Sequence, residues 1–261
     1  MTRRRPATAV FAAMLAILMA ACGGGPAAPA LTDPTEIVTA ALKSTEAAKS
    51  VHVDVLIDGT ATVTLPGSTG TGAPVDLTGT TASADIDFEE PAAKATFSVP
   101  ALVGLAGEVI AVDGKTFVKT TLTGPLYRES AAGGSPVDPG DAGGMIDDLG
   151  DLLLKEGVKL VKGDDVACGT EQCYTVSADL TAEDLGTKGA GAVAGLPVDL
   201  EGASLKLTVR VEKDLPYHLA GVTAVLSLPG GGKVTVELTT SKWDQPVSIK
   251  APPANQVKPA S

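Results

Sequence analysis

The sequence predicts an α+β protein built on a single, strongly curved antiparallel sheet of about eleven strands, with helices over its concave face. Three observations lead to this prediction. Apolar and polar residues alternate with a period of two along many short segments, as in strands with one wet face. The connections are short and rich in glycine and proline, which favours antiparallel pairing. Two segments have a helical period, and an open sheet this wide tends to curl or to need such cover.

The first helix is predicted to begin after residue 33. Asp33 can cap it, Pro34 suits the first helical position, and Glu36 completes a capping box. An apolar stripe follows at helical spacing: Ile37, Val38, Ala41 and Leu42, continued by Thr45. A second helix is predicted over residues 145–155, where Met145, Ile146, Leu149, Leu152 and Leu153 share one face, and a short turn over 181–184.

Strands are predicted wherever the period of two recurs. Their approximate ranges are 51–57, 59–65, 77–88, 93–99, 107–113, 115–121, 157–162, 172–179, 204–212, 217–228, 233–243 and 246–250. Asp113 and Gly114 form the strongest hairpin signal in the chain.

Composition excludes several classes of function. The 261 residues include 31 acidic and 20 basic side chains, a net charge of −11, and a nucleic-acid partner is therefore not expected. Two histidines and three cysteines leave little for a metal site or for histidine-based catalysis. No nucleophile and base can be paired from the sequence, so we expect no enzyme activity, no cofactor and no metal.

Residues 1–21 are predicted to be a lipoprotein-type signal peptide. Three arginines at 3–5 precede an apolar stretch at 9–19, and small residues come directly before Cys22, which resembles a bacterial lipobox. The alternative is an ordinary cleavage site with an accidental cysteine. With Cys22 lipidated, residues 22–32 become a tether, 33–251 the folded domain and 252–261 a flexible tail. The protein is then anchored on the extracytoplasmic face of the cell membrane.

Cys168 and Cys173 are predicted to form a structural disulfide. An exported compartment is oxidising, and the four intervening residues suit a stapled turn. A redox-active pair and two unpaired thiols are the alternatives, although the spacing is not that of a Cys-x-x-Cys motif. His52 and His218 are expected to be surface or hydrogen-bonded side chains. Asp147–Asp148 and Asp164–Asp165 are expected to lie in solvated turns, and Trp243 in the core.

Residue size suggests how the sheet could be used. Aromatic residues make up only 3% of the chain, and the inward strand positions are mostly valine, alanine, threonine and leucine. Such side chains can leave a curved sheet underfilled, and an apolar void binds apolar ligands. The alternative is a sheet that flattens onto its helices and leaves no void.

Several segments, in order, resemble the mycobacterial LppX, LprA, LprF and LprG lipoproteins. They are Lys49-Ser50-Val51-His52-Val53, the hairpin from Val112 to Val118, the helical segment after Asp138-Pro139, Tyr174 to Ala178, Val209 to Glu212, and Leu238 to Val247. The resemblance implies a half-barrel similar to LolA and LolB, with a large apolar cavity for the acyl chains of triacylated lipids and glycolipids. The Cys168 and Cys173 pair departs from the family pattern, and residues 127–147 form a shorter stretch than usual.

Composition and resemblance together predict a membrane-anchored lipoprotein that binds acylated lipids or glycolipids and carries them across or within the cell envelope. Its expected partners are the lipid, the membrane through Cys22, and an inner-membrane lipid exporter as a candidate donor. The predicted cavity-lining residues are Val99, Val109, Phe117, Ile146, Leu149, Leu153, Val209 and Val211. For each of them ordinary core packing is the alternative, and for the whole protein the alternative is a structural or signalling lipoprotein with a filled core.

Overall fold

The computed structural model describes residues 29–63, 73–131, 139–184, 202–229 and 231–258. One compact unit, Leu31–Ser261, holds all the helices and strands named below. Cys22 and the leader lie outside the described residues, so lipidation and the boundaries predicted there stay predictions. None of the described helices combines the length and apolar character needed to cross a membrane.

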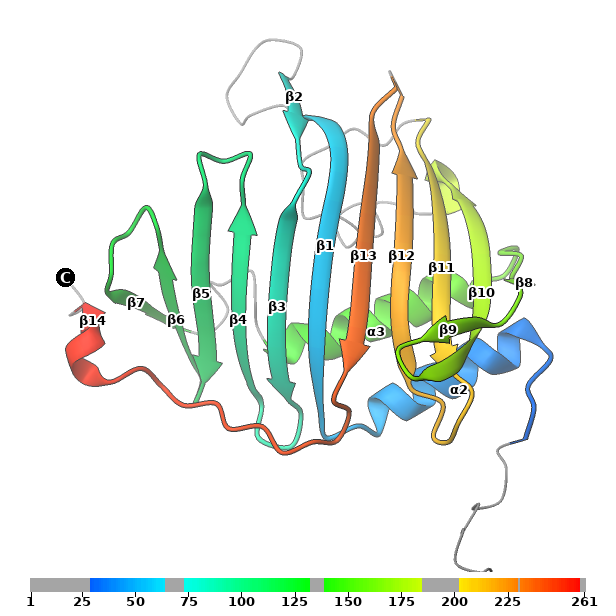
Figure 1. Cartoon of the computed structure of the whole chain (residues 1–261), viewed down its shortest axis with the longest axis horizontal. Coiled ribbons are helices and arrows are strands. Elements are labelled where there is room, and N and C mark those ends of the chain that lie inside the picture. The colour runs from blue at the N-terminus through cyan, green and yellow to red at the C-terminus, as the bar shows by residue number, and fades with distance from the viewer. Residues whose placement is uncertain (1–28, 64–72, 132–138, 185–201, 230, 259–261) are drawn as a thin grey trace, which may run out of the picture. The chain divides into compact units, whose positions relative to one another are not determined.

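A single open sheet dominates the unit (Figure 1). The strands are β1 (Ser50–Val63), β2 (Ala73–Asp76), β3 (Thr80–Asp87), β4 (Ala92–Val99), β5 (Leu105–Val112), β6 (Lys115–Thr120), β7 (Tyr127–Ala131), β8 (Val161–Lys162), β9 (Val166–Cys168), β10 (Glu171–Thr181), β11 (Ser204–Glu212), β12 (Leu219–Ser227), β13 (Lys233–Ser241) and β14 (Val257–Lys258). Their order is β14-β7-β6-β5-β4-β3-β1-β13-β12-β11-β10-β8, with β2 beside β1 and β9 beside β10. All these pairs are antiparallel except β14 with β7.

The predicted fold class is confirmed, because this is one large, curved, mainly antiparallel sheet that does not close. The sheet has 14 strands. Residues 51–57 and 59–65, predicted as two strands, run through Gly59 as β1. Four strands were not predicted, namely β2, β7, β9 and β14, and residues 246–250 are not a strand.

The helices lie on one face of the sheet, called the helix face below (Figure 1). α2 (Pro34–Glu46) begins as predicted, since the Asp33 carboxylate accepts hydrogen bonds from the backbone N–H groups of Thr35 and Glu36. α3 (Pro139–Leu153) begins six residues earlier than predicted. Several glycines interrupt the helical pattern in its first half, which is why the sequence signal there is weak.

Register decides which side chains meet the helices. Residues opposite each other on neighbouring strands point to the same face. Val209 on β11 pairs with Val176 and Val222, and the same face continues through Leu238, Val53 and Val55. Across β3 it reaches Ala84, then Ala95, Val109 and Val118.

Phe117 was predicted to face the cavity, but the structure places it on the face of the sheet opposite the helices. It pairs with Ile110, next to the pair of Val109 with Val118, so it points to the opposite face. There Phe117, Ile110 and Tyr127 form a small buried cluster with Val112, Ile249 and Val257.

The C-terminal tail was predicted to be flexible from residue 252, but part of it is structured. A 3-10 helix, η1 (Ala254–Gln256), precedes β14, which adds to the edge of the sheet beside β7. Ile249 and Val257 cover the cluster around Phe117. The last part of the chain therefore closes the opposite face of the sheet at this edge.

Candidate functional site

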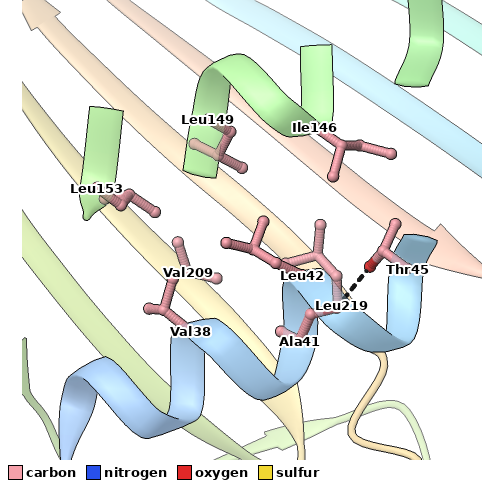
Figure 2. A pocket seen from close by; sticks show the side chains of 9 residues that line it. All are labelled: Val38, Ala41, Leu42, Thr45, Ile146, Leu149, Leu153, Val209 and Leu219. Carbon is pink, nitrogen blue, oxygen red and sulfur yellow. Dashed lines mark hydrogen bonds between the residues drawn. The ribbon is translucent and has the colours of Figure 1, made fainter. Parts of the chain in front are cut away.

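An apolar pocket lies where α2 and α3 meet the sheet (Figure 2). α2 contributes Val38, Ala41, Leu42 and Thr45, α3 contributes Ile146, Leu149 and Leu153, and the sheet contributes Val209 and Leu219. Its lining is almost wholly apolar. The hydroxyl of Thr45 donates to the carbonyl oxygen of Ala41 at 2.8 Å, so this polar group is satisfied within its own helix.

The cavity is small. Its volume is about 10 Å³, which is the space of one water molecule and far less than an acyl chain needs. The underfilled bowl expected from the small side chains is therefore not seen between the described helices and strands, where α2 and α3 pack onto the sheet.

The close approach of the two helices has a local cause. A Cβ placed on Gly150 of α3 would lie 3.1 Å from Cδ1 of Leu42 on α2. Because Gly150 has no side chain, Leu42 can pack directly against the backbone of α3. This contact narrows the space that larger residues would have kept open.

The structure brings four predicted lining residues together around this pocket: Ile146, Leu149, Leu153 and Val209. Val109 and Val211 are buried on the helix face but do not line the pocket, and Val99 lies at the end of β4, partly exposed on the same face. Phe117 is on the opposite face. Whether any of these residues contacts a lipid stays a prediction.

Sequence reasoning missed Val38, Ala41, Leu42, Thr45 and Leu219 as lining residues. The stripe on α2 was visible at helical spacing, but the sequence did not indicate which element it packs against. Leu219 follows an irregular register between β11 and β12 at Arg210 and Val211, which alternation along one strand does not reveal.

A wider apolar surface extends from the pocket across the centre of the sheet. The residues on the helix face of β1, β3, β13 and β12 there are apolar and remain partly exposed: Val53, Val55, Ile57, Ala82, Ala84, Ile86, Val236, Leu238 and Val222. We call these nine residues the apolar strip. On the other face of the same strands the side chains are mainly polar, such as Asp54, Ser83 and Asp85. The two faces therefore differ sharply in polarity.

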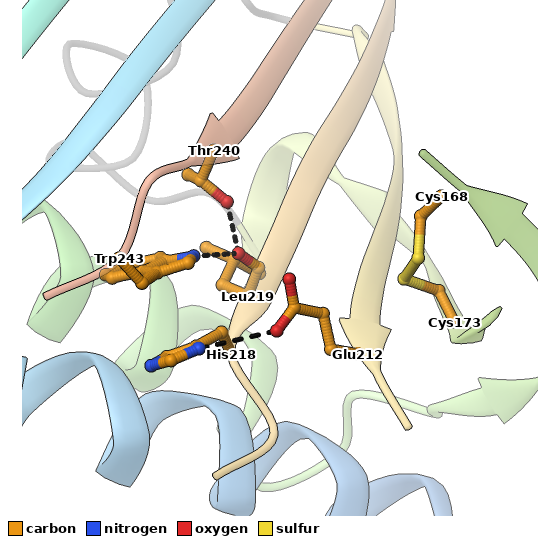
Figure 3. The surroundings of a disulfide bond; sticks show 7 residues. All are labelled: Cys168, Cys173, Glu212, His218, Leu219, Thr240 and Trp243. Atoms are coloured by element: carbon orange, nitrogen blue, oxygen red, sulfur yellow. Dashed lines mark hydrogen bonds and ion pairs between the residues drawn. A yellow bond between two sulfur atoms is a disulfide. The ribbon is translucent and has the colours of Figure 1, made fainter. Parts of the chain in front are cut away.

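Cys168 and Cys173 form a disulfide, as predicted (Figure 3). The bridge links β9 to the start of β10, with the two Cα atoms 5.9 Å apart. Cys173 is fully buried, so the bridge lies under the surface of a short hairpin.

Trp243 and His218 form a second fixed contact near the pocket (Figure 3). Trp243 Nε1 donates to the carbonyl oxygen of Leu219 at 3.2 Å, and the Thr240 hydroxyl donates to the same oxygen. His218 Nδ1 lies 3.3 Å from the Glu212 carboxylate. These contacts hold the end of β13 against the start of β12, next to the pocket residue Leu219.

His52 brings together a serine, a histidine and an aspartate that sequence reasoning did not pair. On the face opposite the pocket, its Nδ1 lies 2.6 Å from Asp85 Oδ1 and its Nε2 3.5 Å from Ser83 Oγ. Nε2 lies nearer to Asp54, at 3.3 Å. Ser83 is also in the middle of β3, which pairs on both sides, so the ladder occupies the neighbouring backbone N–H groups that an oxyanion would need. The cluster is best explained as a hydrogen-bonded histidine on a polar face.

Neither the metal-binding side chains of the described residues nor the sequence comparisons identify a second site or a family. Within the described residues, no group of three or more histidine, cysteine, aspartate or glutamate side chains is arranged to hold a metal ion. No protein-family model matches the chain. A search of curated proteins found no match either.

Solved structures share the fold. LprF from Mycobacterium bovis superposes with a TM-score of 0.58 at 19% identity, covering 84% of this chain and 96% of LprF. The lipoprotein LppX from Mycobacterium tuberculosis superposes with a TM-score of 0.52 at 19% identity, covering 83% of this chain and 98% of LppX. The chain therefore has the fold of these lipoproteins, as the sequence resemblance predicted.

Proposed function

We propose that the protein is an exported lipoprotein that binds acylated lipids or glycolipids on the helix face of its sheet and carries them across or within the cell envelope. It acts by binding and release, without covalent chemistry and without a cofactor. The shared fold with LprF and LppX makes a lipid-binding role a reasonable starting point, and the chain's own residues supply the argument.

The apolar strip is the observation that carries this proposal. A protein that only needed a filled core would cover these valine, isoleucine and leucine side chains, whereas here they stay partly exposed on the helix face. An acyl chain lying on them would remove this surface from water. Each buried methylene contributes about 0.8 kcal/mol, close to its value inside a bilayer, so uptake and release are nearly balanced.

The pocket of about 10 Å³ sets a condition on this mechanism. A tail can enter between the helices and the sheet only if α2 or α3 moves away from the strands. The contact is made by aliphatic side chains such as Leu149, Leu153 and Val209, which an acyl chain can replace with equally apolar contact. Opening then exchanges one apolar contact for another.

The start of the folded unit supports the proposal of an anchor at Cys22. The backbone N–H of Leu31 donates to the Tyr174 hydroxyl at 3.0 Å, which fixes the start of the unit beside β10. Leu31 is the ninth residue after Cys22, and an extended chain of nine residues reaches about 30 Å. A lipidated Cys22 would hold the domain close to the membrane from which it takes lipid.

A second candidate is a structural or signalling envelope lipoprotein with a filled core. The small volume of the pocket favours it directly, because a solid contact between helices and sheet needs no ligand.

Native mass spectrometry separates the two candidates. The protein is expressed in a lipid-containing host, purified without detergent and measured intact. Co-purifying acylated lipid, or uptake of an added fatty-acyl or glycolipid probe, supports the carrier. A clean apoprotein mass that also ignores both probes contradicts it and supports the filled core.

A further inference from the structure

Two neighbouring loops carry four exposed large apolar side chains, including the two most exposed ones of the described residues, Val103 and Leu122. Residues 100–104 connect β4 to β5, and residues 121–126 connect β6 to β7. Both loops lie at the same end of these neighbouring strands (Figure 1). Val103 is 98% exposed, Leu122 75%, Leu102 51% and Leu126 40%. We call these four residues the apolar tip.

Hydrogen bonds tie the 121–126 loop to the start of β5, directly after the 100–104 loop. The Thr121 backbone N–H donates to the carbonyl oxygen of Ala106 at 2.8 Å, and the Ala106 N–H donates to the Thr121 hydroxyl at 3.2 Å. Thr120 and Thr123 bond to each other through both backbone and hydroxyl groups, which fixes the turn that presents Leu122. The tip is therefore ordered before it meets any partner, so docking costs little conformational entropy.

Val103 is held in a conformation that a valine rarely adopts. Its φ is 57°, in the left-handed region that disfavours a β-branched side chain. The Val103 side chain is almost completely exposed, so its burial does not offset this strain. Strain of this kind clusters at sites with a function.

Charge decides what kind of surface fits the tip. No charged residue occurs between Lys94 and Glu108 or between Lys119 and Arg128, in a chain in which 20% of residues are charged. Three of these four flanking charges are paired with one another, since Glu108 lies 3.1 Å from Lys94 and 3.2 Å from Lys119. An uncharged, wholly apolar tip fits the uniform hydrocarbon of a lipid bilayer better than a protein partner, whose specificity would need polar contacts at the rim.

We propose that the apolar tip docks on a lipid bilayer by inserting Leu102, Val103, Leu122 and Leu126 into its surface. This docking needs no anionic lipid, because the rest of the chain is acidic and the tip carries no charge. The docking stands independently of the cargo. If the proposed function also holds, the partly exposed Val99 and Leu105 on the helix face connect the tip with the sheet interior, and tails can move along them.

A fluorescence experiment tests the docking directly. The Leu31–Ser261 unit, a separate compact body without the leader and without Cys22, is labelled with an environment-sensitive dye at L122C or, as the control, at V161C. Val161 is 49% exposed on β8, at the far edge of the sheet. Adding neutral phosphatidylcholine vesicles should shift the emission to the blue at position 122 and leave position 161 unchanged. Equal behaviour of the two positions would overturn the proposal.

Vesicle sedimentation supplies the matched variants. The double substitution Val103→Asp and Leu122→Asp should weaken binding to the same neutral vesicles by at least about tenfold, whereas Val161→Asp should bind as the unchanged unit does. Aspartate tolerates a positive φ better than valine, so the folded state should survive, and a thermal melt checks this. Retained binding by the double variant contradicts the proposal. So does binding only to anionic vesicles that high salt abolishes, or capture of a protein partner without any vesicle binding. Lipid loading measured separately keeps this result distinct from the proposed carrier function.

Discussion

The imidazole ring of His218 lies parallel to the indole of Trp243, with centroids 4.9 Å apart and an interplanar angle of 6°. His218 is buried and precedes Leu219, whose side chain lines the pocket and whose carbonyl oxygen accepts from Trp243. Asp244 follows Trp243 in the sequence, and its carboxylate accepts a hydrogen bond from the backbone N–H of Lys49 at 2.8 Å. This stack therefore ties the end of β13 to the start of β12 and to the junction between α2 and β1.

The Trp243 hydrogen bond should contribute measurably to stability. Trp243→Phe keeps a ring against His218 but removes the indole N–H, and should lower the free energy of unfolding by about 1 kcal/mol. Trp243→Ala removes the ring as well and should cost more. Urea unfolding of the Leu31–Ser261 unit measures both, with Val161→Ala as a surface control expected to change stability by less than about 0.5 kcal/mol. A phenylalanine variant as stable as the parent would show that the hydrogen bond adds nothing.

The disulfide should stabilise a hairpin and leave lipid binding alone. Cys168 and Cys173 close a loop five residues apart in sequence, for which the loop-entropy model gives about 2 kcal/mol. The double variant Cys168→Ala and Cys173→Ala should lose about that much in urea unfolding and keep its lipid loading. A redox role predicts the opposite result: the double variant would be nearly as stable as the parent but would lose any thiol–disulfide exchange activity.

The opposing faces of the sheet show which parts of the fold the sequence predicts and which it does not. The predicted alternation of side chains along the strands is correct, but the pattern of one strand alone does not tell which of its two sets of side chains faces the helices. The turn at Asp113 and Gly114 contains that information, since Val112 pairs with Lys115 across it and Val109 must then pair with Val118. Val109 and Phe117 cannot share a face. Using the turn to fix the register would have placed Phe117 on the opposite face.

The size of the cavity could not be predicted in this way. It depends on how closely α2 approaches α3, which is set by the contact of Leu42 with Gly150 between elements about a hundred residues apart. Side-chain volumes summed along the chain do not contain this distance. The four predicted residues that line the small pocket come from clear periodic patterns, whereas Leu219 depends on a register irregularity that only the paired strands reveal.

Stability should depend on pH through Glu108. Its partial burial alone would raise the carboxyl pKa, but hydrogen bonds with Lys94, Lys119 and Tyr127 outweigh this and hold the pKa below its usual value of 4.5. A pKa lowered by folding gives stability that is complete above the unfolded-state pKa and is lost as pH falls through the folded-state pKa. Glu108→Gln should therefore cost about 1 kcal/mol at neutral pH, and the difference from the parent should shrink as the pH falls below about 4.5. Urea unfolding over a pH series measures it, and a difference that does not change with pH would assign the effect to packing.

Lipid uptake should require the helices to open. In the double variant Leu42→Cys and Gly150→Cys, the oxidising reagent diamide can close a disulfide between α2 and α3, because a Cβ on Gly150 lies 3.9 Å from Cγ of Leu42, the position that a cysteine sulfur can take. The experiment uses the Leu31–Ser261 unit, which lacks Cys22 and in which the other native cysteines, Cys168 and Cys173, are bridged and do not react. The link should reduce uptake of a fatty-acyl probe by about tenfold compared with the same variant before linking. The parent protein treated with the reagent is the control. Uptake that is unchanged after linking would show that tails do not enter between these helices.

Loading should depend on the helix face and not on the opposite face. Val209 lines the pocket and is buried, and Val209→Trp places a large side chain where a tail would lie, so probe uptake should fall severalfold, as it should in Leu149→Trp. Phe117→Leu is the matched control. It removes packing from the cluster with Ile110 and Tyr127 and should lower stability by about 1 kcal/mol, yet leave uptake unchanged because that cluster faces away from α2 and α3. Native mass spectrometry with a fatty-acyl probe measures uptake, and urea unfolding confirms that each variant is folded. Unchanged uptake in both tryptophan variants would remove the pocket from the binding site, and loss of uptake in Phe117→Leu would show that the opposite face takes part.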